Sequence, residues 1–111
     1  MSNLDLSYLK SVTDGDKELI KELIEIFKNQ VPEYLQDFQD AYQQKDAKTL
    51  SQIAHKSKSS VAIMGMNRLA ADLEKFEKEA REGQFSEQYI NYIENFDKQC
   101  QDALMQLEIL I

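Results

Sequence analysis

The stretch DAKTLSQIAHKSKSSVAIMG, residues 46–65, predicts one long helix with a single buried side. Its apolar or small side chains recur at the three- and four-residue spacing of a helix face: Leu50, Ile53, Ala54, Ser57, Val61 and Met64. Asp46 offers a capping carboxylate at the start, and Gly65 is suited to end or kink the helix. We therefore expect a helix over about residues 47–64 that packs into a core.

The segments before this helix show the same periodicity. A short helix is expected over residues 4–12, followed by turn residues 13–16 that also cap the next helix. The apolar face of that second helix is expected to hold Leu19, Leu23, Ile26 and Phe27, widened by Ile20 and Ile24. Pro32 should interrupt it, because proline lacks an N–H donor and disfavours a helical residue before it.

Two more helices are expected after Gly65. The first covers residues 67–82 and ends at Gly83, and Ser86 caps the last helix. The apolar face of the last helix contains Tyr89, Ile93, Phe96, Cys100, Ala103, Leu104 and Leu107. Because the connections are short, consecutive long helices should pack antiparallel. We predict one all-α domain over residues 1–111, an antiparallel four-helix bundle with its core over about 15–110 and an additional short N-terminal helix.

The composition excludes several classes of function. The 111 residues carry a net charge of −7, which disfavours nucleic acid and anionic membranes as partners. The single cysteine rules out an intrachain disulfide, and with one histidine and one distant cysteine we expect no metal site. Cys100 is expected to be buried and structural. The N-terminus lacks the basic and apolar regions of a secretory signal, so we expect a cytoplasmic protein. We also expect the protein to be a monomer.

The only histidine, His55, lies outside the apolar face of its helix. Its row is polar or small and is expected to face solvent: Ser51, Gln52, His55, Lys58, Ser59 and Ala62. From periodicity alone, a surface histidine without a role is the favoured interpretation. The chemistry supports another one. A neutral imidazole accepts a phosphoryl group near neutral pH, and Lys58 one turn away can hydrogen-bond the phosphoryl oxygens.

The spacing of His55, Lys58, Ser60 and Gly65, continued by Leu69, Leu73 and Glu77, resembles the pattern of the histidine-containing phosphotransfer (HPt) domain family. The resemblance covers about residues 15–110. It implies that His55 is the phosphorylated residue and that Lys58 steadies the phosphoryl group. It also implies that Gly65 lets the His55 helix pack closely against, or turn into, the next helix. Arg81 falls where some family members have a basic residue that approaches the phosphoryl group.

The sequence departs from the family pattern at two positions. Ser59 stands where a glycine is usual, and its hydroxyl can hydrogen-bond the imidazole ring or the phosphoryl oxygens. Ser57 stands where an apolar residue is usual, which removes some core burial. Around the histidine, Lys56 adds positive potential. Met64 and Met66, which flank Gly65, are expected to fill the core; the alternative is an exposed apolar rim that docks a receiver, for which Ala62 and Met66 are the best candidates. The acidic residues of 74–82 alternate with lysines and are expected to form a solvated face.

The resemblance implies a phosphocarrier of a two-component multistep phosphorelay. Its partners would be the receiver domains of response regulators or hybrid histidine kinases, with His55 shuttling the phosphoryl group between receiver aspartates. The sequence has no nucleotide-binding glycine motif, so we expect no ATP-dependent kinase activity and no cofactor, with Mg²⁺ only on the partner receiver. An alternative of a different class is a helical module that carries no phosphate and inhibits a receiver or histidine kinase by binding it.

Overall fold

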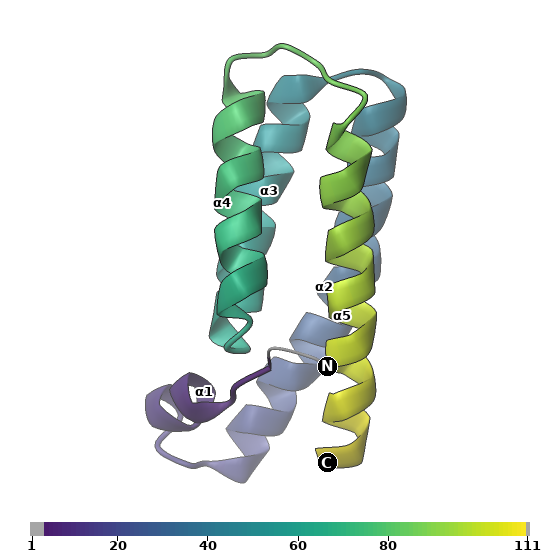
Figure 1. Ribbon diagram of the computed structural model, residues 1–111. Helices are drawn as coiled ribbons and strands as arrows, with labels where there is room; N and C mark the ends of the chain where they lie inside the picture. The colour runs from purple at the N-terminus through teal and green to yellow at the C-terminus, as the bar shows by residue number, and fades with distance from the viewer. Residues whose placement is uncertain (1–3, 111) are drawn as a thin grey trace.

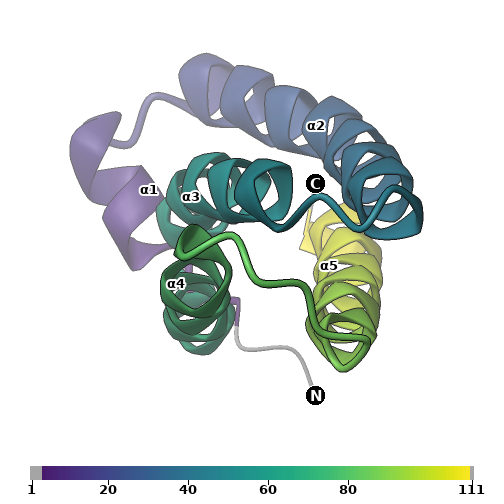
Figure 2. The ribbon, with the colours of Figure 1, turned by 90° about the horizontal axis from the view of Figure 1, so that it is seen from above.

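The computed structural model describes residues 4–110, which form five helices and no strand. Their bounds are α1 Ser7–Val12, α2 Lys17–Gln43, α3 Ala47–Ile63, α4 Asn67–Arg81 and α5 Tyr89–Leu110. Helices α2 to α5 run alternately up and down as an antiparallel four-helix bundle, and α1 lies below α3 and α4 (Figures 1 and 2). The predicted fold class is therefore confirmed, including the additional short N-terminal helix.

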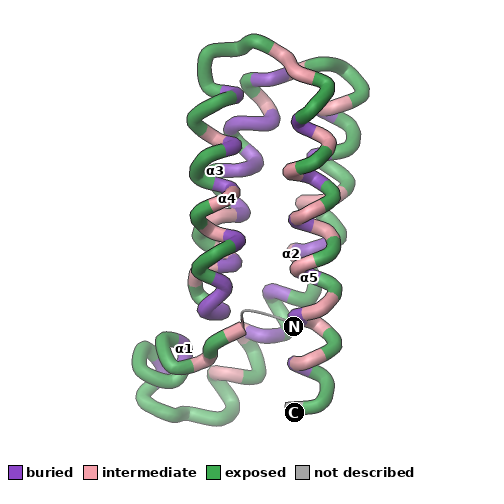
Figure 3. The backbone as a smooth tube through the Cα atoms, viewed as in Figure 1, coloured by how far each residue is buried: buried purple, intermediate pink, exposed green. Residues whose placement is uncertain are grey.

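Three phenylalanines from three helices form the centre of the core. Phe38 of α2, Phe76 of α4 and Phe96 of α5 are each 0% exposed. The Phe38 ring lies 5.7 Å from the Phe76 ring and 5.3 Å from the Phe96 ring, measured between centroids. Each buried ring contributes roughly 1.5–3 kcal/mol. Figure 3 shows that buried residues line the inner sides of the four long helices.

The interruption that we expected at Pro32 is wrong. Helix α2 runs through Pro32 without a break, and Pro32 itself is exposed. A proline inside a helix costs about 3 kcal/mol, because one hydrogen bond is lost and the ring crowds the preceding turn. Buried side chains on both sides of Pro32, namely Phe27, Val31 and Phe38, hold the two halves of α2 against the same core and offset this cost.

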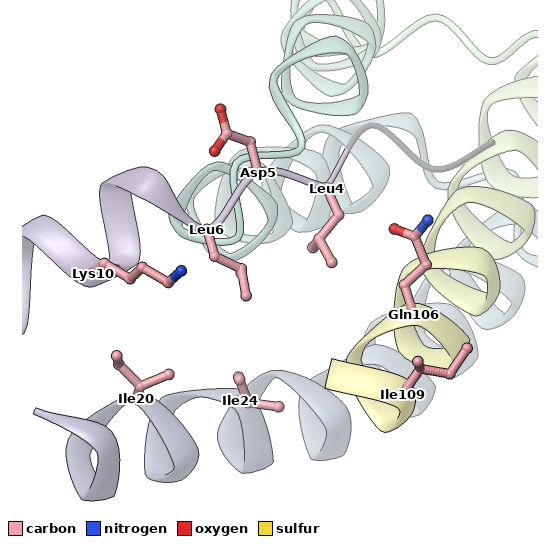
Figure 4. Close-up of a pocket in the computed structure, with 8 residues that line it drawn as sticks. All are labelled: Leu4, Asp5, Leu6, Lys10, Ile20, Ile24, Gln106 and Ile109. Carbon is pink, nitrogen blue, oxygen red and sulfur yellow. The ribbon is translucent and has the colours of Figure 1, made fainter. Parts of the chain in front are cut away.

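The expected apolar face of α2 is also corrected. Ile24, Phe27 and Val31 share one side of α2 and are buried, whereas Leu19, 39% exposed, and Ile26, 50% exposed, lie on another side of the helix. Helix α2 has 27 residues and α3 has 17, so the start of α2 extends past α3 (Figure 1). At that end Ile20 and Ile24 face a groove that is also lined by Leu4 and Leu6, and by Ile109 from α5 (Figure 4).

Polar caps begin α2 and α3 where the sequence predicts them. The Asp16 carboxylate accepts the N–H groups of Glu18 and Leu19, and the Asp46 carboxylate accepts the N–H of Thr49. At the other end of the bundle Gly83, with φ +84°, follows α4 as expected. Ser86 accepts the N–H of Gln88 in the turn that leads into α5. Within residues 4–110, no helix combines the length and apolar character needed to cross a membrane.

Gly65 joins the turn between α3 and α4 to the N-terminal segment. Its φ is +74°, and a Cβ atom built on it would lie 1.7 Å from the Asp5 carbonyl oxygen. The backbone N–H of Asp5 donates to the carbonyl of Met64 at 3.3 Å. Gly65 does turn α3 into α4 as expected, but the chain that approaches it closely is the N-terminal segment. This contact, with the hydrogen bond that the Asp5 carboxylate accepts from the Ser7 N–H, holds the chain before Ser7 outside the helix, so α1 starts at Ser7 rather than at residue 4.

We expect Gly65→Ala to destabilise the protein more than Gly15→Ala. Both glycines have left-handed backbone angles, φ +74° and +75°, which cost an alanine roughly 1–2 kcal/mol. A Cβ at Gly15 has no atom within 4 Å, whereas a Cβ at Gly65 overlaps the Asp5 backbone. Displacing that segment should add about 1–3 kcal/mol, the range of overpacked sites. Urea unfolding of the two variants measures the difference, and equal losses would contradict the proposed Asp5 contact.

Candidate functional site

His55 lies midway along α3 with its side chain 64% exposed to solvent. Its Nδ1 atom is 3.0 Å from Oε2 of Glu77, a residue of the neighbouring helix α4. An ionised carboxylate can only accept hydrogen bonds, so Nδ1 must carry the proton. In the neutral ring the second nitrogen, Nε2, then has a free lone pair. The contact fixes one side of the ring and leaves the nucleophilic nitrogen on the other.

Glu77 connects His55 to two cations. Its Oε1 atom accepts a hydrogen bond from Lys58 Nζ at 2.9 Å, and its Oε2 atom lies 3.5 Å from Arg81 Nη2. The Glu77 side chain is only 12% exposed, whereas Arg81 is 60% exposed. Lys58 is also 3.9 Å from Glu74 Oε1. The structure therefore brings together the predicted His55, Lys58 and Arg81 around one shared carboxylate.

The charge of Glu77 is maintained by these neighbours. Burial by itself would raise the pKa of the Glu77 carboxyl group. The hydrogen bond and positive charge of Lys58, followed by the contribution of His55, outweigh burial and hold this pKa below its ordinary value of 4.5. Glu77 is therefore ionised at neutral pH and keeps its negative charge beside the imidazole ring.

Small side chains let α3 and α4 approach closely enough to form this site. Ser51 was expected to face solvent, but it is buried and its hydroxyl donates to the backbone carbonyl of Glu77 at 2.9 Å. Ala54 and Ser57 are 0% exposed, and the Ser57 hydroxyl donates to the Ile53 carbonyl of its own helix. Ser57 stands where the family pattern has an apolar residue, and its buried hydroxyl group has a hydrogen-bond partner inside the core.

The other predicted site residues are spread along the surface of α3. Lys56 is exposed and lines a shallow depression with His55 and Glu77. Ser59 is exposed and Ala62 is half-buried, and both line a separate cleft further along the helix. Met66 is 1% exposed, so its expected place in the core is confirmed and its assignment to an exposed rim is wrong. It is the N-cap residue of α4, and its side chain is part of the hydrophobic core.

Sequence analysis missed Glu77 as a site residue, because the acidic residues of 74–82 were expected to be solvated. That expectation is wrong at Glu77. One signal was present: Glu77 directly follows the core residue Phe76 and lies four residues after Leu73, so it flanks the buried face of its helix. The same spacing places Arg81 four residues later on the same side.

The described residues include no group of three or more His, Cys, Asp and Glu side chains arranged to hold a metal ion. Cys100 is buried as expected. Burial, and then the nearby Asp97 carboxylate, raise the pKa of its thiol to about 12. A thiol that stays protonated at neutral pH is a poor nucleophile. The reactive chemistry of the described surface therefore centres on His55.

Comparison with known proteins identifies the family. The family model of the Hpt domain matches residues 22–108, which include every residue of the His55 site. The chain belongs to the Hpt domain family. It is a histidine phosphotransfer protein of a phosphorelay.

The Hpt fold is also seen in a solved structure. The chain superposes on the crystal structure of histidine-containing phosphotransfer protein B (HptB) from Pseudomonas aeruginosa PAO1 with a TM-score of 0.85. The sequences are 24% identical, and the match covers 96% of this chain and 91% of HptB. At that identity the likeness supports the fold, including the short helix α1 that lies outside the family match. No curated protein sequence matches the chain.

We expect Glu77→Gln to lower the stability of this Hpt domain at neutral pH, and the loss to shrink in acid. A carboxyl group whose pKa is depressed by folding stabilises the folded state fully above its ordinary value, here 4.5, and the stabilisation is lost as the pH falls through the lower folded value. Thermal unfolding between pH 7 and pH 3 measures this. Glu74→Gln, which removes a charge from the same helix and leaves Glu77 paired, is the control. A difference from wild type that does not change with pH would contradict the pairing.

Proposed function

We propose that His55 accepts a phosphoryl group from the phosphorylated aspartate of one receiver domain and passes it to the aspartate of a second. The observation that carries this proposal is the geometry of the ring. Glu77 holds the Nδ1 side at 3.0 Å, and the imidazole is exposed enough for a partner to reach Nε2. The family match supports phosphotransfer, and the position of the ring supports His55 as the acceptor.

The transfer step follows from this tautomer. The lone pair of Nε2 attacks phosphorus, a P–N bond forms, and the bond between phosphorus and the aspartyl oxygen breaks. The receiver carboxylate leaves with the bonding electrons. The proton stays on Nδ1, so the ring becomes positively charged as the bond forms. Glu77 is already hydrogen-bonded to Nδ1–H and stabilises that charge, as a carboxylate does behind a catalytic histidine in hydrolases. The reverse sequence delivers the group to the next receiver.

Lys58 and Arg81 stabilise the phosphoryl group once it is on His55. Both cations already lie near the ring, because they bind the carboxylate that holds it. Lys58 Nζ is 2.9 Å from Glu77 Oε1, and Arg81 Nη2 is 3.5 Å from Glu77 Oε2. A phosphoryl group brings roughly −1.5 to −2 charges and three acceptor oxygens, so it competes with Glu77 for these donors. Ser59 is exposed one turn beyond His55 and adds a hydroxyl to the same side of α3. Lys58 and Arg81 thus exchange the Glu77 carboxylate for the phosphoryl oxygens.

The proposal requires no cofactor on this chain. Phosphoryl transfer needs a metal ion to neutralise charge between the reacting groups, and we place the Mg²⁺ in the acidic pocket of the receiver. Lys56 next to the ring contributes positive potential toward that acidic pocket, and Ala62 offers a small, half-buried contact. The partners are then receiver domains of response regulators or hybrid histidine kinases.

The decisive test is transfer from an aspartate-phosphorylated receiver domain. Wild-type protein should gain acid-labile, alkali-stable phosphate, and His55→Gln should gain none while keeping its helicity and melting temperature. Label on the variant would show that another residue is the acceptor. A protein that binds receivers equally well with and without His55, and never carries label, would instead be the inhibitory module.

We expect Lys58→Ala to slow phosphoryl acceptance by about 10–100-fold. A charge-assisted hydrogen bond contributes roughly 1.5–3 kcal/mol, and each 1.4 kcal/mol is about a factor of ten in rate. Rapid-quench measurement of labelled protein at saturating receiver gives the rate. Lys98→Ala, which removes an exposed lysine from α5, is the matched control. If both variants transfer at the wild-type rate, Lys58 has no role in the step.

A further inference from the structure

Lys58 is shared between two carboxylates of α4. Its Nζ atom lies 2.9 Å from Oε1 of Glu77 and 3.9 Å from Oε1 of Glu74. Glu74 precedes Glu77 by three residues, so the two side chains are neighbours on the surface of the helix and reach the same ammonium group. The first distance is that of a hydrogen bond, and the second is that of an ion pair without one. Lys58 therefore holds Glu77 more firmly than it holds Glu74.

Glu74 has fewer partners than Glu77. The Glu77 carboxylate also accepts a hydrogen bond from His55 Nδ1, at 3.0 Å, and lies 3.5 Å from Arg81. Within the part of the chain that the structure describes, the contact with Lys58 is the only ion pair or hydrogen bond of the Glu74 side chain. If Lys58 moves, Glu77 keeps its bond to the imidazole ring, whereas Glu74 loses its one partner.

A phosphoryl group on His55 competes with these carboxylates for the ammonium group of Lys58. It brings roughly −1.5 to −2 charges and three acceptor oxygens, which is more negative charge than one carboxylate carries. Lys58 follows His55 by three residues and is its neighbour on the surface of α3, so its side chain can turn from α4 to these oxygens. The contact with Glu74, at 3.9 Å, is the weaker of its two contacts and is lost first. The loss of that contact opposes phosphorylation.

The coupling between Glu74 and the phosphoryl group runs through Lys58. The Glu74 side chain is 54% exposed and makes no hydrogen bond or ion pair with His55. Water and salt screen a half-exposed charge from groups that it does not contact. Lys58 is only 25% exposed, so the charges that it contacts directly are screened less. The lysine is thus the group through which Glu74 acts on the state of His55.

We propose that Glu74 competes with the phosphoryl group for Lys58, and so shifts the transfer equilibrium away from phosphorylated His55 and toward the receiver aspartate. In this exchange a P–O bond to the aspartate breaks as a P–N bond to Nε2 forms, or the reverse. The leaving group takes the bonding electrons, and the proton stays on Nδ1. Glu74 touches none of the reacting atoms, so it is a positioning residue that acts through Lys58. The proposal rests on the proposed function, because it takes His55 as the acceptor.

The consequence is a carrier that gives up its phosphoryl group readily. A carrier that bound the group too tightly would retain it, and little would reach the second receiver. With Glu74 in place, Lys58 returns to two carboxylates when the group leaves, and both contacts favour release. The same lysine therefore stabilises the phosphoryl group and limits how firmly the group is held.

The test is the equilibrium constant for transfer between this protein and one receiver domain, obtained from forward and reverse rates by rapid quench. The probe is the receiver that labels wild-type protein best. Glu74→Gln should shift the constant toward phosphorylated His55 by about 3–5-fold, the upper range for an exposed ion pair. Glu94→Gln, which removes an exposed carboxylate from α5, should leave it unchanged. A constant for Glu74→Gln equal to that of wild type would overturn the proposal.

The same substitution in a Lys58→Ala background shows whether Glu74 acts through the lysine. With Lys58 absent, Glu74→Gln should leave the equilibrium constant nearly unchanged, because no cation is left for the two anions to share. A shift of equal size in both backgrounds would overturn the proposal, since Glu74 would then act on the phosphoryl group by direct repulsion.

Failure of this proposal and failure of the proposed function give different results. Label on His55 of the wild-type protein, with an equilibrium constant that Glu74→Gln does not move, overturns the role of Glu74 and leaves the proposed function intact. Absence of label on His55 in wild type and Glu74→Gln alike overturns the proposed function, and the role of Glu74 with it.

Discussion

The close packing of α3 against α4 is the constraint on which the rest of the molecule depends. It requires small side chains at the contact, and Ser51, Ala54 and Ser57 supply them on α3. The hydroxyl of Ser51 reaches the backbone carbonyl of Glu77, which fixes the register between the two helices. Because of that register, the Glu77 carboxylate meets both His55 and Lys58. If Glu77 stood one position earlier or later in α4, its carboxylate would point to another side of that helix, away from His55 and Lys58.

The shared carboxylate links stability and chemistry at one position. A largely buried charge is tolerated only when it is paired and hydrogen-bonded, and Glu77 obtains its partners from His55, Lys58 and Arg81. The same contacts set the tautomer of the ring and hold two cations beside it. The groups that keep Glu77 ionised in the folded state are thus the groups that the proposed phosphoryl transfer uses, so the site is organised before any partner arrives.

Local pattern predicted the helices and their caps, because these depend on residues near one another in the sequence. It also placed His55 and Lys58 on one exposed row of α3. It failed where tertiary packing decides. Pro32 stays inside α2 because the core holds both sides of it, and Ile26 is exposed because it lies on a different side of α2 from the buried Ile24 and Phe27. Met66 stayed open between core and rim, and Glu77 was expected to be solvated, since their burial depends on the turn and on the register between two helices.

Gly65 shows how one position serves both the bundle and its surface. A left-handed turn between α3 and α4 needs a residue without a strong steric penalty, and that alone favours glycine. In this chain the missing Cβ also leaves space for the Asp5 carbonyl, so the N-terminal segment reaches the end of α3. Helix α1 is thereby placed beside the surface that continues from His55. The glycine that ends the His55 helix thus also fixes the position of α1, because the Asp5 segment that leads into α1 rests on it.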